Sequence, residues 1–137
     1  MSPDGRWLAY ASNQSGLTNE VYVRPFGSAG GGRWQVSTGG GSQPVWAPSG
    51  RELFFLDGRA RLIAAQVQAG TTFAVGDLVP LFDAARFARD EFHQSYEVTP
   101  DGRSFLFALS RRPADGGAST RLVWVDHWFT DLRERLR

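Results

Sequence analysis

Few residues in this chain could perform covalent or acid–base chemistry. Its 137 residues include two histidines, no cysteine and no lysine, because all 15 basic residues are arginines. The chain therefore lacks thiolate nucleophiles, cysteine metal sites, disulfides, Schiff-base lysines and the lysine of a P-loop. The two imidazoles, His93 and His127, fit no spacing of a histidine metal or metalloprotease motif. This composition favours binding over catalysis.

The remaining patterns that resemble catalytic motifs are weak. Residues 40–44 lack the last glycine of a nucleophile elbow. Asp90 and Glu91 could form a carboxylate pair or bind a cation, but a solvated loop is the interpretation that we favour. Asp126 and His127 are adjacent, and neighbours in a strand point to opposite faces, so they form no ready dyad. We predict a protein that is not an enzyme, with no catalytic residues, no cofactor and no metal site.

Three copies of one short sequence motif, which we call the repeated phrase, organise the chain and would position any functional site. Each copy has a small residue, proline, aspartate or serine, glycine and arginine, and an apolar segment follows. Proline fixes φ at the first corner, aspartate or serine bonds back to nearby N–H groups, and glycine accepts positive φ, so each copy predicts a tight turn between two strands. A period in the forties with strands and glycine turns is typical of β-propeller blades. The copies are Ser2–Arg6, Ala47–Arg51 and Thr99–Arg103.

These copies divide the chain, a single domain over residues 1–137, into three units over 1–41, 42–92 and 93–137. We predict an all-β fold: a half-propeller of about three four-stranded antiparallel blades. The first unit lacks its inner strand, and the third unit lacks its outer strand. The expected strands are 7–12, 20–24 and 33–37 in the first unit, 44–46, 52–57, 61–68 and 78–82 in the second, and 96–98, 104–109 and 121–128 in the third.

Two further segments carry predictions of their own. Residues 84–92 form a longer crossover that could contain a helical turn. Residues 130–137 predict a short C-terminal helix, because Thr130 is a good N-cap and Asp131 and Arg135 are an i,i+4 pair. Such a helix usually covers an exposed sheet edge.

The candidate binding residues follow from this arrangement. Polar residues at the start of inner strands would line the mouth of a propeller channel, where ligands often bind. These possible ligand contacts are Ser42, Gln43, His93, Gln94 and Ser95. Interfaces favour aromatic residues, so the possible subunit interface comprises Trp7, Trp124, Trp128 and Phe129. For Trp7 and Trp128, burial in the core is the alternative, whereas Trp46 aligns with Val98 and is expected in the core.

Charge and hydropathy limit the partners. A net charge of +1 predicts neither nucleic-acid binding nor attraction to an acidic membrane. No apolar run is long enough to span a bilayer, and no signal peptide is present, so the localisation stays undetermined, with a cytoplasmic protein expected as expressed. Met1 directly precedes the first repeat, which we expect either from a deliberately short reading frame or from the cut edge of a longer protein.

The repeat resembles the TolB-like β-propeller repeat of bacterial proteins, over nearly the whole chain. The end of the chain resembles the last blade of propellers carried C-terminally by many bacterial serine/threonine kinases. The resemblance implies a fold of about six blades, about twice what this chain holds, and it implies no kinase activity because no kinase motif is present. The matching segments are 2–10, 20–26, 34–41, 44–46, 50–55 and 123–135.

Three hypotheses for function follow. The first is a non-enzymatic scaffold or binding module that self-associates, two copies supplying about six blades as a homodimer, with the cut edges repaired by strand exchange or terminal segments. Its further partner would be a protein or a small molecule. The second is a C-terminal sensor or interaction fragment of a longer kinase-linked or periplasmic propeller. The third is a hydrolase at the channel mouth, for which the candidates would be Gln43, Asp90, His93 and Gln94.

Overall fold

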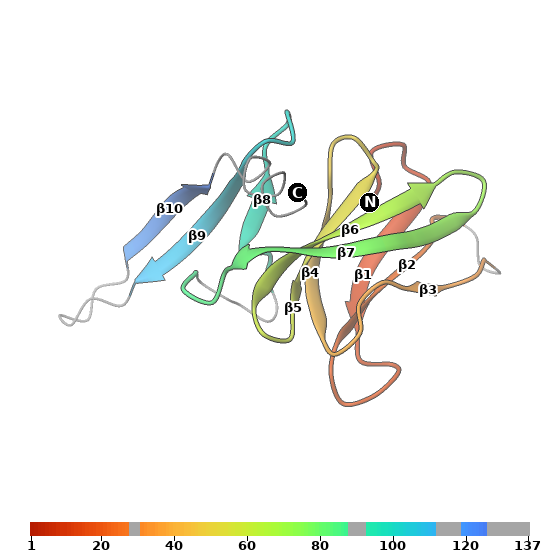
Figure 1. Cartoon of the computed structure of the whole chain (residues 1–137), viewed down its shortest axis with the longest axis horizontal. Helices are drawn as coiled ribbons and strands as arrows, with labels where there is room; N and C mark the ends of the chain where they lie inside the picture. Colours follow the sequence, from red (N-terminus) through yellow and green to blue (C-terminus); the bar gives the residue numbers. More distant parts are fainter. Residues whose placement is uncertain (28–30, 88–92, 112–118, 126–137) are drawn as a thin grey trace.

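The computed structural model describes residues 1–27, 31–87, 93–111 and 119–125 (Figure 1). These residues form ten strands and no helix, which confirms the predicted all-β class. The helix expected over 130–137 lies outside the described residues. The strands are β1 Trp7–Ser12, β2 Glu20–Pro25, β3 Trp34–Gln35, β4 Gly41–Trp46, β5 Glu52–Asp57, β6 Arg61–Ala69, β7 Phe73–Asp83, β8 Tyr96–Val98, β9 Phe105–Arg111 and β10 Ser119–Val125.

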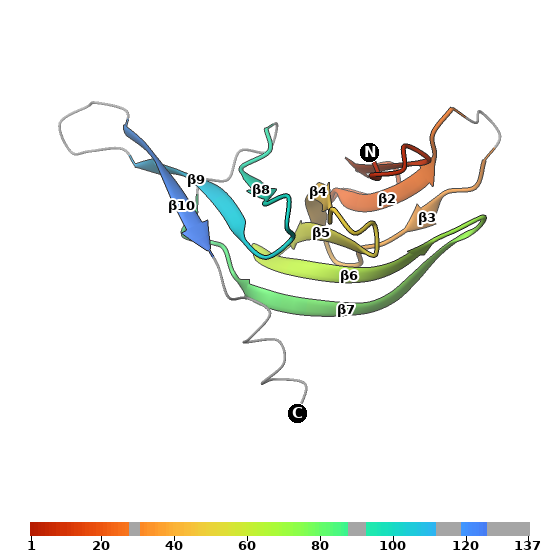
Figure 2. The same cartoon turned by 90° about the horizontal axis from the view of Figure 1, so that it is seen from above.

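The strands form three separate antiparallel sheets, one for each predicted unit. Sheet 1 has the order β1-β2-β3, sheet 2 the order β4-β5-β6-β7, and sheet 3 the order β8-β9-β10. Sheet 2 lies between the other two sheets (Figure 2). Sheet 1 lacks a counterpart of β4, and no described strand pairs with β10 on its outer side, so β1 and β10 are edge strands within the described part of the chain.

Sheet 2 is apolar on both faces because it is covered on both sides. On β5, Phe54 and Leu56 belong to the hydrophobic cluster shared with sheet 3, whereas Leu53 and Phe55 belong to the cluster shared with sheet 1. This is the period-two alternation of a strand, since successive side chains point to opposite faces. The rings of Phe54 and Phe105 meet edge to face, with centroids 4.8 Å apart, and join sheet 2 to sheet 3.

A buried carboxylate fixes the passage from sheet 1 to sheet 2. Glu20 is 8% exposed, and its Oε1 accepts hydrogen bonds from the backbone N–H groups of Gly39 (3.0 Å) and Gly40 (2.9 Å). Its Oε2 accepts the hydroxyl of Ser37. Gly40 has a φ of 104°, which only glycine adopts readily. The glycine-rich connection is therefore held by specific bonds.

Several predicted boundaries were wrong. β4 begins at Gly41 rather than at residue 44, with a bulge after Ser42 where Gln43 has a φ of 53°. β3 covers Trp34–Gln35 rather than 33–37, because the N–H groups of Val36 and Ser37 both turn to the carbonyl of Val21 (2.8 and 3.5 Å).

The outer strand of sheet 2 is also longer than expected. β7 spans Phe73–Asp83 instead of 78–82, because β6 and β7 extend together as a long hairpin. The hairpin carries Phe73 onto sheet 1, where its ring centroid lies 5.4 Å from that of Trp7 and 5.8 Å from that of Trp34. The crossover contains a turn and no helix over 84–87, and residues 88–92 lie outside the described part.

Candidate functional site

The three repeated phrases fold into the same turn, as predicted. In each turn the glycine N–H donates to the carbonyl three residues earlier, at 2.9 Å for Gly5, 2.9 Å for Gly50 and 2.8 Å for Gly102. The three glycines have φ values of 71°, 69° and 70°. The backbone therefore repeats with the same geometry at the start of β1, β5 and β9.

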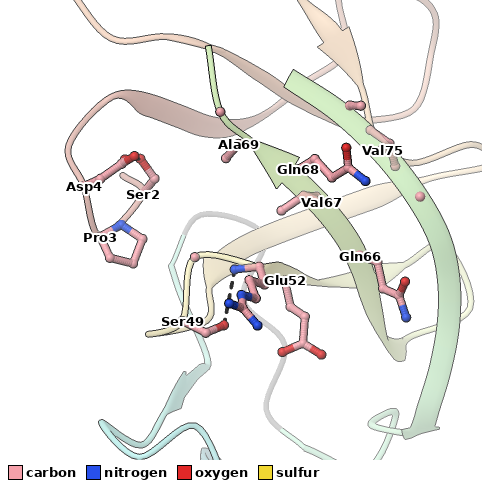
Figure 3. A pocket seen from close by; sticks show the side chains of 15 residues that line it. Ser2, Pro3, Asp4, Ser49, Glu52, Gln66, Val67, Gln68, Ala69 and Val75 are labelled. Atoms are coloured by element: carbon pink, nitrogen blue, oxygen red, sulfur yellow. Dashed lines mark hydrogen bonds between the residues drawn. The ribbon is translucent and has the colours of Figure 1, made fainter. Parts of the chain in front are cut away.

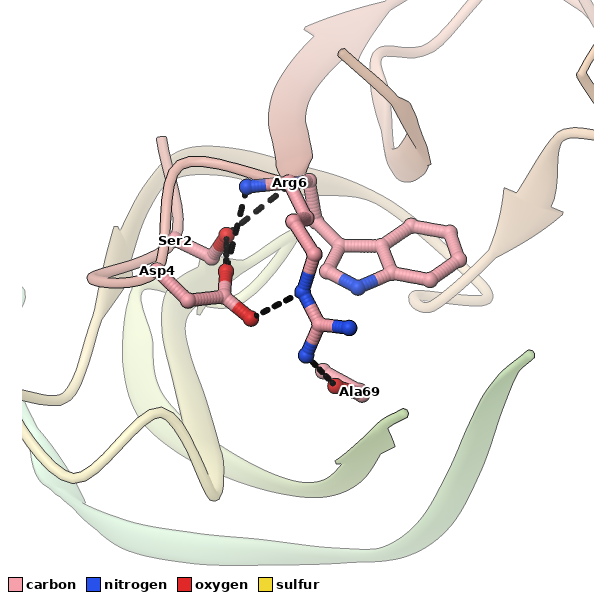
Figure 4. Close-up of polar contacts among 5 residues, drawn as sticks. Ser2, Asp4, Arg6 and Ala69 are labelled. Carbon is pink, nitrogen blue, oxygen red and sulfur yellow. Dashed lines mark hydrogen bonds and ion pairs between the residues drawn. The ribbon is translucent and has the colours of Figure 1, made fainter. Parts of the chain in front are cut away.

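The aspartates of the phrase serve the turns. In Figure 4, Asp4 accepts the hydroxyl of Ser2 (2.6 Å) and the backbone N–H of Arg6 (3.1 Å), and it pairs with Arg6 Nε (2.7 Å). These hydrogen bonds lower the pKa of Asp4 to about 2, and the bond from the Ser2 hydroxyl has the largest effect. Asp101 accepts from Thr99 and from the N–H of Arg103 in the same way. Neither carboxylate is placed as a general acid.

Successive turns also lie side by side. A Cβ built on Gly50 would lie 3.8 Å from Pro3 Cδ, and one built on Gly102 would lie 3.8 Å from Pro48 Cδ. A Cβ built on Gly5 would meet no atom of the described part of the chain within 4 Å, its two chain neighbours aside. The proline of each turn thus lies beside the glycine of the next turn. No described proline lies beside Gly5, and the proline of the third turn, Pro100, has no later described turn beside it.

The five predicted ligand contacts are only partly brought together. Gln43 Oε1 accepts the N–H and the hydroxyl of Ser95, both at 2.8 Å, and the Tyr96 hydroxyl donates to the Gln43 carbonyl at 2.9 Å. These bonds tie sheet 2 to sheet 3. His93 and Gln94 are exposed, and Ser42 is half-buried. Within the described residues no three His, Asp or Glu side chains gather as a metal site.

A groove that the sequence did not predict lies beside the first two turns (Figure 3). Its volume is about 830 Å³, and its walls are residues 2–4, 49–52, 66–70 and 74–76. Two turns and the β6–β7 hairpin therefore form it jointly. The Arg6 Nη2 donates to the carbonyl of Ala69, one of the wall residues, at 3.3 Å.

Among the ionisable wall residues of this groove, Glu52 is half-buried, whereas Asp4 and Arg51 are exposed. Burial raises the pKa of Glu52, and no hydrogen bond or ion pair to its carboxylate is formed by the described residues. Gln66, its partner in the ladder, is exposed beside a β-bulge. The groove supplies a carboxylate and amides that could bind a polar molecule. The Ser2 hydroxyl in the groove wall donates to the Asp4 carboxylate at 2.6 Å, and this bond belongs to the first turn.

The tryptophans divide between core and surface. Trp7 is 4% exposed and Trp46 is 7% exposed, and both lie in the cluster between sheets 1 and 2. For Trp7 the structure thus gives the core alternative. Trp124 is 60% exposed on β10. Trp128 and Phe129 lie outside the described residues, as do Asp90, Glu91, Asp126 and His127.

The end face of sheet 3 is apolar, and no other described strand packs on it. Val123 and Val125 pack into the cluster with sheet 2, whereas the alternating residues Leu122 and Trp124 are 70% and 60% exposed. The same alternation places two half-buried β9 residues on this face, since Phe105 and Phe107 point into the core. We define the end face of sheet 3 as Leu106, Ala108, Leu122 and Trp124.

The opposite end of the molecule has a face of different character. Trp7, Ala9, Val21 and Val23 of sheet 1 pack toward sheet 2, so the alternating residues form the other face. We define the end face of sheet 1 as Leu8, Tyr10, Tyr22 and Arg24. Its Tyr22 is covered by the Arg33 guanidinium, 4.6 Å from the ring centroid, and Arg24 is exposed.

Sequence reasoning identified Trp124 but missed the rest of these two faces. Comparing each residue of the third unit with its counterpart in the buried second unit would have revealed them. In the described part of the chain no helix has the length and apolar character needed to cross a membrane. No family model matches the chain, and no curated protein sequence matches it.

Proposed function

We propose that this chain is a non-enzymatic β-propeller module, similar to the TolB-like repeat, which self-associates to complete a ring. Two copies of three sheets would give a ring of about six blades. The observation that carries the proposal is the exposed apolar end face of sheet 3, with Leu122 70% and Trp124 60% exposed on an edge strand.

The difference between the central sheet and the two outer sheets supports this proposal. Sheet 2 packs against another sheet on both faces, whereas sheets 1 and 3 each pack against another described sheet on one face only. On the other face of sheet 1, Tyr22 is 1% exposed and lies beneath the Arg33 guanidinium. Exposed apolar patches rimmed by polar residues are typical of protein–protein contacts, and open edge strands such as β1 and β10 favour pairing with another chain. A second copy satisfies both ends at once, because each chain carries one end face of each kind.

Binding of a further partner is the second part of the proposal. The groove with Glu52 lies outside both end faces, so it would stay accessible in a ring. We propose that the assembled module is a scaffold that presents such grooves to a protein or small-molecule partner. The paucity of reactive side chains favours this role over a hydrolase at the ends of β4 and β8.

The test is the mass in solution of two matched variants. Leu122→Glu places a carboxylate on the end face of sheet 3, whereas Leu78→Glu places one on β7 of sheet 2, where Leu78 is 42% exposed and lies on neither end face. We expect about 30 kDa by light scattering for the wild type and Leu78→Glu, twice the 15.1 kDa of the chain, and 15 kDa for Leu122→Glu.

Other outcomes would reject the proposal. A wild-type monomer with cooperative unfolding would show that the chain is stable with its end faces exposed. A polydisperse wild type would favour the second hypothesis, in which further blades of a longer protein cover the same faces.

A further inference from the structure

The repeat specifies which residues the end face of sheet 3 should contact. Counting from the turn glycine and following the strand registers, each residue of that face has a counterpart in sheet 2 that is already buried. Leu106 corresponds to Phe54, and Trp124, its cross-strand neighbour, corresponds to Ala64. Ala108 and Leu122 correspond in the same way to Leu56 and Leu62.

The same count identifies the receiving face. Sheet 2 packs on Phe105 and Val125, which are cross-strand neighbours in sheet 3. Their counterparts in sheet 1 are Leu8 and Arg24, which are also cross-strand neighbours. Phe107 and Val123 correspond likewise to Tyr10 and Tyr22. The end face of sheet 1 therefore occupies the position that sheet 3 presents to sheet 2.

We propose that the end face of sheet 3 docks on the end face of sheet 1 of a second copy, in the register by which sheet 2 packs on sheet 3. This inference rests on the proposed self-association and adds its residue pairs. Leu106 contacts Leu8 of the partner subunit, as Phe54 contacts Phe105 within the chain. Trp124 lies against Arg24 of the partner subunit.

The side chains at these positions suit the contact. Arg24 is exposed and Trp124 is 60% exposed, so both can reorient. A guanidinium on an indole face is a favourable cation–π pair, and tryptophan and arginine are enriched at interface hot spots. Within the chain, Phe82 of β7 is the cross-strand neighbour of Leu62, and its ring centroid lies 6.1 Å from that of Phe105. Since no described strand follows β10, Trp124, which is larger than its counterpart Ala64, would fill space between the two copies that β7 fills beside sheet 2.

The turns give an independent second constraint. Pro3 lies beside Gly50 and Pro48 lies beside Gly102, so the next member of the series places Pro100 beside Gly5 of the partner subunit. A Cβ built on Gly5 would have no atom of the described residues within 4 Å other than those of its chain neighbours. The two faces are different, so the contact is head-to-tail, and using it twice closes a two-fold ring.

Bis-maleimide crosslinking tests this register. Because the chain has no native cysteine, only the introduced cysteines can react with the reagent. Packed sheets lie about 10 Å apart, farther than a disulfide spans, so a short bis-maleimide is required. Leu8→Cys and Leu106→Cys are prepared as separate proteins. We expect a covalent dimer when they are mixed with the reagent, and loss of that product when either is treated alone.

Two controls keep the test decisive. Leu106→Cys mixed with Leu17→Cys, a fully exposed position in the β1–β2 loop, should give no covalent dimer. Arg24→Cys mixed with Trp124→Cys repeats the test at exposed positions, where folding is not at risk. This mixture is crosslinked at high protein concentration, because one of the two contacts in the mixed dimer then lacks the Trp124 side chain.

The outcomes separate this inference from the proposal beneath it. A protein of dimer mass that crosslinks through Leu106→Cys alone would show that sheet 3 pairs with itself, which overturns the register and leaves self-association intact. A dimer mass with no crosslink in either mixture would also overturn the register. A monomer without crosslinks would overturn both.

Discussion

Removal of the Trp124 side chain is the perturbation whose effect can be worked out most fully. A tryptophan buries roughly 150–250 Å² when packed, and Trp124 is 60% exposed, so docking would cover on the order of 100 Å² of its surface. At about 25 cal/mol per Å² this contributes about 2–3 kcal/mol at each contact. A two-fold ring uses the contact twice. Trp124→Ala should therefore weaken dimerisation by about 4–6 kcal/mol, or roughly 10³–10⁴-fold in the dissociation constant.

Sedimentation equilibrium over a dilution series measures that constant. Leu78→Ala is the matched control, because Leu78 is an exposed apolar residue of β7 in sheet 2, outside both end faces. The unfolding free energy of the isolated Trp124→Ala chain should change little, since exposed positions seldom contribute more than about 0.5 kcal/mol. A dissociation constant for Trp124→Ala that equals that of Leu78→Ala would refute the reasoning.

Three further predictions concern stability and its dependence on pH, each measured by urea denaturation. Glu20→Ala leaves the Gly39 and Gly40 N–H groups and the Ser37 hydroxyl without their acceptor, so it should cost on the order of 3–5 kcal/mol; a loss smaller than that of Ser37→Ala would contradict this role. Glu52→Gln should stabilise the chain at pH 7 and leave it unchanged at pH 4, because burial raises the pKa of Glu52 and penalises only its charged form; equal effects at both pH values would count against it. Although burial raises the pKa of Asp57, hydrogen bonds from Arg61 and Arg59 outweigh it and lower the pKa overall. The stability that Asp57 contributes is therefore complete above about pH 5 and is lost as the pH falls below about 4. In Asp57→Asn the unfolding free energy should fall less steeply over this pH range than in the wild type. An unchanged slope would disprove this role of Asp57.

The repeats made the framework predictable because their chemistry is local. Proline, aspartate or serine, and glycine specify a turn within a few residues, and the turns ending at Gly5, Gly50 and Gly102 have the geometry expected of them. The continuous apolar run Leu53–Leu56 likewise indicates a strand buried on both faces. These features predict the all-β class, which the ten strands confirm.

The missed features depend on contacts between distant segments. The length of β7 follows from the packing of Phe73 on Trp7 and Trp34 of another sheet, which no local pattern encodes. The early start of β4 depends on a bulge at Gln43. The groove arises where two turns meet the β6–β7 hairpin, so its residues share no motif in the sequence.

The candidate site was hardest to predict where polar side chains form hydrogen bonds with one another. Gln43 and Ser95 were expected to face a ligand, yet they bond each other across two sheets. The end face of sheet 3 was partly foreseen through Trp124. Its extent becomes clear only when the alternation of Leu122 and Val123 is compared with the buried second unit.

Sedimentation equilibrium of the unmodified chain at micromolar concentration is the most direct measurement of the central claim that a second copy covers the end faces. We expect a single species of about 30 kDa, twice the 15.1 kDa chain. A single species of 15 kDa that unfolds cooperatively would contradict it, since the chain would then be stable with Leu122 and Trp124 exposed to water.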